Sequence, residues 1–391
     1  MNSSISITAI ASLSPLGNSA VTVWENYLSN ATCIRSRDVQ GQAFFQASIP
    51  EHLRAEIAQV RNSHPHYLTL DETVIYAILV ARLAIQQAGW NSIDEVGINL
   101  GSSRGATQLF EQYHQDFLNN ASTPKLCSPN TTLGNISSWV AHDLKIQGPQ
   151  VSHSVTCSTG LHAVLNGVAW LRAGMSTKFL VGASEAPLTA FTLHQMQALK
   201  ITARAASADG NYPCRALDFD KQENTMVLGE GAAVACLEPG IVPHALAIIE
   251  GVGYASDDAR YNFSLSESAI CFQKSMKMAM GSIGPDEIDC IILHAPGTIL
   301  GDSAEFKAIQ AVFGTHLPML TTNKWKIGHS LGASGMLSLE LAILMLQHQQ
   351  FIPVPFIPEQ KRRSDMNKIL INAVGFGGNA VTILLSKVSL E

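Results

Sequence analysis

The sequence predicts an α/β fold, because short strand-like runs rich in Val, Ile and Leu alternate with helical runs along the whole chain. The chain has 391 residues, of which 46% are hydrophobic and 14% charged, so it can form a large buried core and a covered subunit surface. The order of elements also repeats after Pro239-Gly240. We therefore expect two similar halves, residues 1–240 and 241–391.

Hydrophobic periodicity predicts the elements of each half. In the first half we expect strands at 5–10, 96–102, 151–156 and 179–183, and helices at 21–28, 70–88, 133–144 and 157–174. In the second half we expect strands at 245–253, 290–294, 369–372 and 380–386, and helices at 266–280, 304–312 and 332–347. The two most apolar helical runs contain Arg82 and Glu340, so we expect buried core helices rather than membrane spans.

The bulk composition excludes several classes of protein. A formal net charge of −6 without a Lys/Arg cluster argues against nucleic-acid binding. Seven scattered cysteines without a Cys-x-x-Cys pair fit a reduced compartment and argue against a metal site. The N-terminus has no basic segment before an apolar core, so it does not resemble a secretory signal. We expect a cytoplasmic oligomer without a membrane span.

Cys157 lies in Thr156-Cys157-Ser158-Thr159-Gly160, where a strand-like run meets a helical pattern. A thiol in the first turn of a helix faces unpaired N–H groups and the positive end of the helix dipole, which favours the thiolate. This position is therefore suited to a nucleophile. The alternative is a small buried hydrophobic residue, the usual role of a lone cysteine.

Two histidines also occupy strand-to-helix junctions. His294 ends the apolar run 290–293, and His329 lies in a glycine-bounded turn before another apolar helix. A cysteine with two neutral imidazoles suits acyl transfer, in which the thiol carries a thioester and the imidazoles stabilise charge on a second substrate's carbonyl. Each histidine could equally be structural. The loop Gly375-Phe376-Gly377-Gly378 could supply an oxyanion-hole N–H or be a plain tight turn.

Several motifs together resemble the β-ketoacyl-acyl carrier protein synthases, condensing enzymes of the thiolase superfamily. The segment around Cys157 resembles the nucleophile motif of that family, and Leu228-Gly229-Glu230-Gly231-Ala232 resembles its Gly-Glu-Gly-Ala segment. The segment from His294 to Asp302, with Glu305, resembles its His-Gly-Thr-Gly-Thr motif and the following acidic helix start. Lys324 and His329 have the spacing of the family's lysine and second histidine.

The resemblance implies a role for each matching residue. Cys157 would accept the acyl group, His294 and His329 would stabilise the enolate formed from malonyl, and Lys324 would orient that site. Phe376, between Gly375 and Gly377, would gate the acyl pocket, and its N–H would complete an oxyanion hole with that of Cys157. Thr298 would bind the phosphopantetheine arm of acyl carrier protein. The implied fold is the duplicated five-layered α/β/α/β/α arrangement, active as a dimer and without a cofactor.

Two departures from the family's pattern leave an alternative open. Pro296 replaces a threonine in the His294 motif, and the loop before Asn379 lacks one residue and has Val374 in place of an aromatic residue. The chain could therefore be a non-catalytic partner that resembles a chain-length factor, paired with a paralogous ketosynthase. The altered motifs also resemble synthases of specialised type II systems, such as aryl-polyene or flexirubin clusters. A thiolase is disfavoured because the second catalytic cysteine is absent.

Overall fold

Two five-stranded sheets with the same strand order form the centre of the protein. The computed structural model describes residues 4–90, 95–133, 135–204, 211–258, 265–358 and 365–388. The first sheet has the order β1 (Ile5–Leu13), β8 (Gly231–Pro239), β6 (Phe179–Glu185), β4 (Gly97–Gly101) and β5 (Gln150–His153). The second has the order β9 (Ala247–Ser256), β13 (Asn379–Ser386), β12 (Lys368–Gly375), β10 (Cys290–Ile292) and β11 (Met319–Thr321).

The direction of the strands repeats as well as their order. In each sheet the first three strands are antiparallel neighbours, and the last three are parallel. Parallel neighbours require crossover connections, which the helices between them supply. The predicted duplication is therefore present in the topology.

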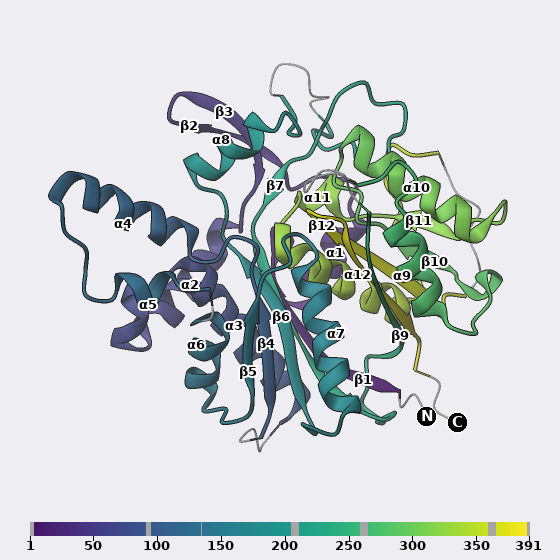
Figure 1. Ribbon diagram of the computed structural model, residues 1–391, viewed down its shortest axis with the longest axis horizontal. Helices are drawn as coiled ribbons and strands as arrows, with labels where there is room; N and C mark the ends of the chain where they lie inside the picture. Colours follow the sequence, from purple (N-terminus) through teal and green to yellow (C-terminus); the bar gives the residue numbers. More distant parts are fainter. Residues whose placement is uncertain are drawn as a thin grey trace.

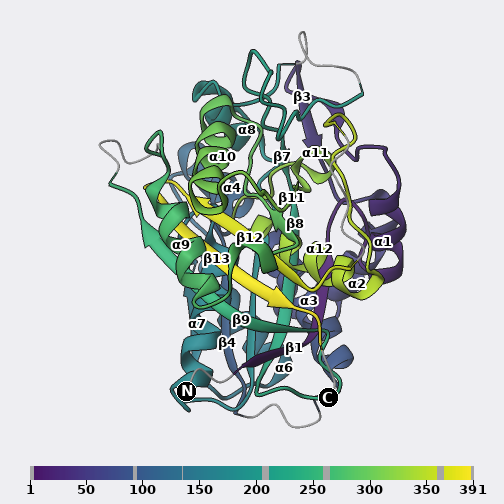
Figure 2. The same ribbon diagram turned by 90° about the vertical axis from the view of Figure 1, so that its right-hand side faces the viewer.

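Helices cover both sheets and fill the space between them (Figures 1 and 2). On the outer face of the first sheet lie α3 (Glu72–Ala88) and α6 (Asn135–Leu144). The middle layer consists of α7 (Thr159–Arg172) and α12 (Ser334–His348), which contact strands of both sheets. On the far face of the second sheet lie α9 (Ile270–Met280) and α10 (Ile299–Phe313). These layers confirm the predicted five-layered fold.

Alternating strand residues belong to different hydrophobic cores. In β6, Val181 packs in the central core and Leu180 in the outer one. In β12, Ile371 faces the central core and Leu370 the core beneath α9 and α10. This alternation follows from the two-residue period of a strand. Among the described residues one helical stretch, Leu331–His348, is long and apolar enough to cross a membrane, but 89% of it is buried inside the protein. The predicted core helix is confirmed.

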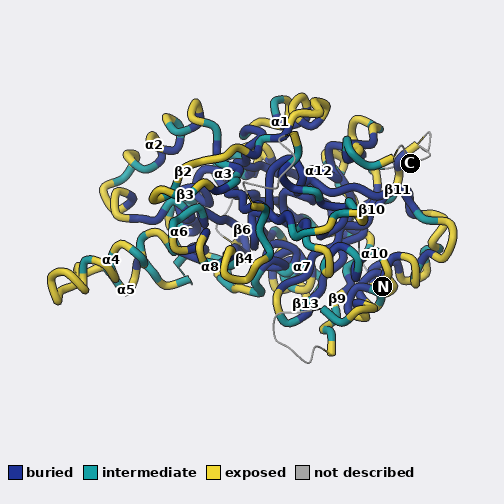
Figure 3. Tube along the Cα trace, turned by 90° about the horizontal axis from the view of Figure 1, so that it is seen from above, coloured by how far each residue is buried: buried dark blue, intermediate teal, exposed yellow. Residues whose placement is uncertain are grey.

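The periodicity missed several elements. One is β8, whose buried segment is rich in alanine and apolar on both faces, so it shows no alternation. The others are the strand β11, a small sheet and five α-helices: β2 (Arg35–Val39), β3 (Gln42–Ala47) and β7 (Leu228–Gly229), with α2 (Arg54–Asn62), α4 (Thr107–Asn120), α5 (Cys127–Thr131), α8 (Ala190–Ala198) and α11 (Lys324–Ile327). The α4 helix has no buried residue and extends away from the body with α5 (Figure 3).

Candidate active site

The predicted site residues follow the carboxyl ends of strands in both sheets. Cys157 comes after β5, His294 after β10, and Lys324 and His329 after β11. Gly375 is the last residue of β12. Because the carboxyl ends of parallel strands are where α/β proteins gather their functional groups, topologically matching strand ends of the two halves supply the site.

The loop that carries Cys157 is fixed by its neighbours. Thr156 has a φ of +48°, an unusual value for a β-branched residue. The Thr159 Oγ1 accepts a hydrogen bond from the Val155 N–H at 2.9 Å and donates to the Thr156 carbonyl at 2.6 Å. A Cβ atom at Gly375 would lie 2.1 Å from Thr156 Oγ1 and 2.4 Å from the Val155 carbonyl oxygen. The end of β12 thus packs directly against the cysteine loop and has room only for glycine.

Cys157 is buried, with 7% of its surface exposed, and this burial controls its protonation. Burial, and to a smaller extent the charge of Glu185, raise the pKa of the thiol to about 12 against the opposing effect of Lys324. The expectation that the helix start favours the thiolate is wrong, because the pKa of the thiol is raised. The structure begins α7 at Thr159 with Ser158 as its N-cap, so Cys157 lies outside the first turn.

The two histidines face each other at the centre of the site. Their ring centroids lie 5.2 Å apart, and their planes are nearly perpendicular. Burial, followed by the charge of Lys324, lowers the pKa of His329 to about 3, and burial lowers the pKa of His294 well below its ordinary value. Both imidazoles are therefore neutral at pH 7. Neutral imidazoles can donate a hydrogen bond and are not repelled by the positive charge of Lys324.

The two rings differ in their hydrogen bonds. His329 Nδ1 lies 2.7 Å from Ser334 Oγ, which fixes the ring orientation. His294 Nδ1 is buried and has no hydrogen-bond partner among the described residues. A buried polar atom with unmet hydrogen-bonding capacity in a strand-end loop is typical of a ligand-binding position. The ring of His329 is thus held by a hydrogen bond within the protein, whereas Nδ1 of His294 can form a hydrogen bond with a ligand.

Lys324 is the buried cation of the site. Its side chain is almost fully buried, and burial lowers the pKa of the ammonium to about 8, while Glu305, Cys214 and Cys157 raise it. Glu305 accepts hydrogen bonds from the backbone N–H groups of His294 and Ala295 at 3.0 and 2.8 Å. Lys324 is therefore electrostatically coupled to the thiol, to the loop that carries His294 and to both imidazoles.

Thr298 occupies the N-cap of α10, where its Oγ accepts a hydrogen bond from the Gly301 N–H at 3.2 Å. A hydroxyl that accepts one bond can still donate its proton elsewhere. Pro296 stands two residues before it and supplies neither a hydroxyl nor an N–H. Of the two threonines expected to donate hydrogen bonds to the phosphopantetheine arm, only Thr298 is therefore present.

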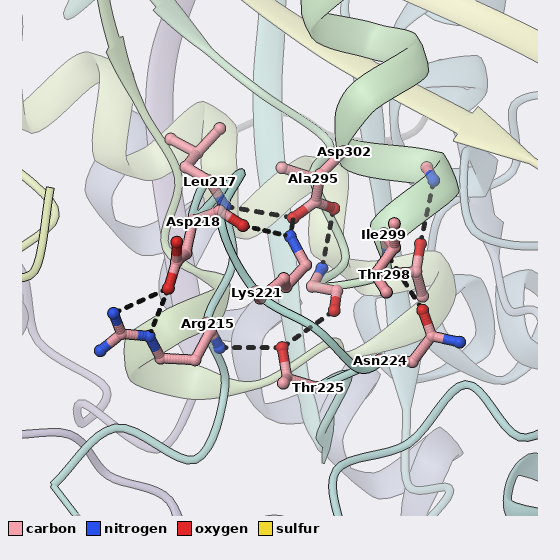
Figure 4. A network of polar contacts seen from close by, with 12 residues as sticks. Arg215, Leu217, Asp218, Lys221, Asn224, Thr225, Ala295, Thr298, Ile299 and Asp302 are labelled. Carbon is pink, nitrogen blue, oxygen red and sulfur yellow. Dashed lines mark hydrogen bonds and ion pairs between the residues drawn. The ribbon is translucent and has the colours of Figure 1, made fainter. Parts of the chain in front are cut away.

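A polar network joins the loop before Thr298 to residues 215–225 (Figure 4). Asp302 accepts hydrogen bonds from the Gly297 N–H at 3.0 Å and the Leu217 N–H at 3.1 Å, and its Oδ2 lies 2.8 Å from the ammonium of Lys221. The Gly297 carbonyl in turn accepts bonds from the backbone N–H and the hydroxyl of Thr225. This network fixes the position of the loop between His294 and Thr298.

Phe376 lies in the tight turn between β12 and β13. Gly378 donates to the Gly375 carbonyl at 3.0 Å, and both Gly377 and Gly378 have positive φ values. Phe376 is 41% exposed and follows directly after the contact between Gly375 and the cysteine loop. The shortened loop therefore forms a closed hairpin, with its aromatic side chain outside the core.

Sequence reasoning missed the part played by Glu185. It ends β6 and accepts hydrogen bonds from the backbone N–H groups of Ser103 and Gly332, joining loops of both halves. Burial raises the pKa of its carboxyl to about 7. The available signal was a carboxylate at the end of an otherwise apolar strand, Leu180-Val181-Gly182-Ala183-Ser184-Glu185. Among the described residues, no group of His, Cys, Asp and Glu is placed to hold a metal ion.

Comparison with known proteins gives the family. The β-ketoacyl synthase N-terminal domain matches residues 2–240, and the C-terminal domain of the same family matches residues 246–356. A 3-oxoacyl-[acyl-carrier-protein] synthase 2 of Staphylococcus aureus is 25% identical over 415 residues and covers 99% of both chains.

Solved structures share the fold. One described as the ishigamide ketosynthase/chain length factor has a TM-score of 0.85 at 20% identity and covers all of both chains. Another, a type II polyketide synthase acyl-carrier protein in complex with its ketosynthase bound to the hexaketide, has a TM-score of 0.84 at 18% identity and covers 99% and 100%. With the two family domains spanning most of its length, this chain belongs to the β-ketoacyl synthase family.

Proposed function

We propose that the protein is a 3-ketoacyl-acyl carrier protein synthase, an acyltransferase that condenses an acyl thioester with malonyl-acyl carrier protein. The observation that carries the proposal is the convergence of Cys157 with two neutral histidines and Lys324, drawn from both halves of the chain. The halves 1–240 and 241–391 would supply the nucleophile and the remaining groups, respectively. The product would enter fatty acid or type II polyketide synthesis.

The first step transfers the acyl group to Cys157. Its Sγ attacks the thioester carbonyl, the new S–C bond forms, and the S–C bond to the phosphopantetheine arm breaks. The thiol proton passes to the departing sulfur. The N–H groups of Cys157 and Phe376 would hold the oxyanion, and Thr298 would donate to the arm. Because the resting thiol is protonated, we assign its activation to the bound state, with Lys324 stabilising the developing negative charge.

The second step removes carbon dioxide from malonyl-acyl carrier protein. His294 and His329 donate hydrogen bonds to the malonyl thioester oxygen, the carboxylate leaves as carbon dioxide, and its bonding electrons form the enolate. The enolate carbon then attacks the acyl carbonyl. The S–C bond to Cys157 breaks, and the released thiolate takes up a proton. The decarboxylation supplies the carbanion, so the step needs no cofactor.

We also propose that the chain functions as a cytoplasmic dimer, with a second copy or with a paralogous ketosynthase or chain-length factor. Two features support this. The α4–α5 arm exposes Phe110, Phe117, Leu118 and Leu126. In addition, β5 is the last strand of the first sheet and pairs with β4 on one side, and an edge strand of this kind can pair with a partner. Acyl carrier protein would be the transient partner that delivers both substrates.

The test is acylation followed by intact-mass measurement. Purified protein is incubated with acyl-acyl carrier protein, and we expect one acyl adduct that is absent from Cys157→Ala. The matched control is Cys271→Ala, since Cys271 is also a buried thiol whose pKa is raised to about 12 but lies on α9. If no donor acylates the protein, alone or beside a paralogous subunit, the catalytic proposal fails and a chain-length-factor role takes its place.

The histidine roles are tested separately. We expect His294→Ala and His329→Ala to retain acylation of Cys157 and to lose decarboxylation, measured as carbon dioxide released from labelled malonyl-acyl carrier protein. Loss of acylation in both folded variants would contradict the assignment.

A further inference from the structure

Cys157 belongs to a small apolar cluster that is separate from the three cores between the layers. The other buried members are Phe44, Leu193, Met196, Met226, Leu228 and Leu331. They come from β3, α8, β7 with the residues just before it, and the turn before α12, so they surround the thiol from outside the central layers. This cluster is the apolar environment of the thiol, and an acyl group attached to Sγ would extend into it.

The α8 helix limits the room in that cluster. It contributes Leu193 and Met196, which are 3% and 7% exposed. Methionine is unbranched and flexible, so Met196 can give way to a few carbon atoms. A longer chain requires α8 itself to move outward, because close-packed side chains leave no further space.

Arg104 holds α8 in place. One nitrogen of its guanidinium, Nη2, donates to Thr192 Oγ1 at 3.1 Å and to Gln195 Oε1. Thr192 and Gln195 lie on the same helix as Leu193 and Met196. Within the part of the chain that the structure describes, Arg104 forms no ion pair, so these hydrogen bonds are the charged group's protein contacts.

The backbone around Arg104 is held in place by the carboxylate of Glu185. The Ser103 N–H donates to Glu185, which also accepts from Gly332, and the N–H of Arg104 bonds to the same carboxylate. Arg104 therefore links a rigid loop beside the nucleophile to the helix that covers it. Outward movement of α8 would break charge-assisted hydrogen bonds, which are stronger than neutral ones.

We propose that Arg104 sets the length of the acyl chain that Cys157 accepts, by latching α8 over the nucleophile, so that the substrates are short acyl groups and long saturated chains are excluded. This inference rests on the proposed function. Arg104 acts here as a specificity-determining residue that works through the position of α8.

The experiment compares the rates at which hexanoyl- and dodecanoyl-acyl carrier protein acylate Cys157, followed by intact mass. For the wild type we expect hexanoyl to load at least about tenfold faster than dodecanoyl. In Arg104→Met the dodecanoyl rate should rise by about tenfold while the hexanoyl rate stays the same. Arg104→Lys, which keeps the charge on a shorter side chain, should lie in between.

Two further variants separate selectivity from folding. Thr192→Val combined with Gln195→Leu removes the same hydrogen bonds from the α8 side and should reproduce the change in the ratio of the two rates. Arg82→Met is the matched control, because Arg82 is also a partly buried arginine but pairs with Asp143 on the outer helices. It should leave the ratio unchanged, since general destabilisation affects both chain lengths equally.

The outcomes distinguish a failure of the Arg104 latch from a failure of the proposed function. Equal loading of both chains by the wild type, or an unchanged ratio in folded Arg104→Met and in the double variant, overturns the latch and leaves the proposed function intact. No adduct with either chain overturns the proposed function and the latch with it.

Discussion

Burial determines the protonation of the candidate site residues one residue at a time. The thiol of Cys157 and the imidazoles of His294 and His329 are all pushed toward their neutral forms by loss of solvent. Lys324 is the opposing influence, because its positive charge lowers the pKa of the thiol and disfavours a charged imidazole. The site therefore holds neutral donors beside one buried cation.

This arrangement predicts slow alkylation of Cys157. Iodoacetamide reacts with thiolates, so its rate at Cys157 should be low at pH 7 and rise with pH up to about 10, without a plateau near pH 8.5, because the pKa of the thiol is raised to about 12. Lys324→Met should slow the reaction further, since it removes the cation that stabilises the thiolate. Peptide mapping of the alkylated protein gives the rate.

The half-exposed Cys127 provides the internal comparison in the same digest. Alkylation of Cys157 at pH 7 as fast as that of Cys127, or a faster rate in Lys324→Met, would contradict the assigned electrostatics.

Sequence motifs indicated the candidate site residues but not their charge states. Cys157, His294 and His329 could be found because each stands beside small residues at a strand-to-helix junction, whereas Lys324, between Asn323 and Trp325, was indicated by its spacing in the family resemblance. Their pKa values depend on burial by α8, α12 and the opposite half, which have no local signature. The contribution of Glu185 was hidden for the same reason, because its partners Ser103 and Gly332 are distant in sequence.

At the scale of elements, α12 shows how an apolar helix accommodates a charge. Almost all of its residues are buried, and among them Glu340 accepts a hydrogen bond from Ser12 at 2.7 Å. Burial raises the pKa of the Glu340 carboxyl to about 7. Since the carboxyl in the unfolded chain ionises near its ordinary value of about 4.5, the folded protein binds one more proton between these pH values.

Glu340→Gln should therefore stabilise the protein in a pH-dependent way. Between pH 4.5 and 7 the wild type loses about 1.4 kcal/mol of stability per pH unit through this group. The variant, whose amide oxygen can still accept from Ser12, should match the wild type at pH 4.5 and exceed it by about 3 kcal/mol at pH 8. Urea unfolding at both pH values measures the difference.

Glu25→Gln, on the exposed side of α1 (Ala20–Leu28), should show no such pH-dependent gain. A Glu340→Gln variant that is less stable than the wild type at pH 8 would show that the carboxylate is stabilising where it lies.

Long amphipathic or apolar elements such as α3, α12, β12 and β13 were predictable, because periodicity and flanking glycines mark them. The small sheet of β2, β3 and β7 was not. Its first two strands form a hairpin around Gln40-Gly41, but β2 is almost wholly exposed and shows no apolar alternation. The third strand, β7, has only two residues and pairs with β3 from a distant part of the chain, so no local pattern could reveal it. That sheet nevertheless contributes Phe44 and Leu228 to the surroundings of Cys157.

At the scale of the whole molecule, the arm formed by α4 and α5 projects from the body and is not covered by other elements that the structure describes. The arm formed by α4 and α5 exposes Phe110 and Leu118 by 61% and 62%. Exposed large apolar groups concentrated on one arm are typical of a protein contact. In the proposed dimer this arm would lie against the partner subunit.

Phe110→Asp combined with Leu118→Asp should therefore convert the dimer to monomer, as seen by sedimentation velocity, because charges in an apolar contact are costly to bury. Val21→Asp, a charge at a comparably exposed apolar position on α1, should leave the dimer intact. A dimer that survives the double substitution would place the subunit contact elsewhere.

The contact between Gly375 and the cysteine loop has a consequence for the smallest working form of this fold. A turn from the second half touches Thr156 and Val155 of the first with no room for one more carbon atom. Each half has a complete sheet with the same strand order, yet Cys157 lies in the first half, whereas His294, Lys324 and His329 lie in the second. Both halves are therefore needed to form the candidate site, so a gene truncated at the boundary between them would yield an inactive fragment.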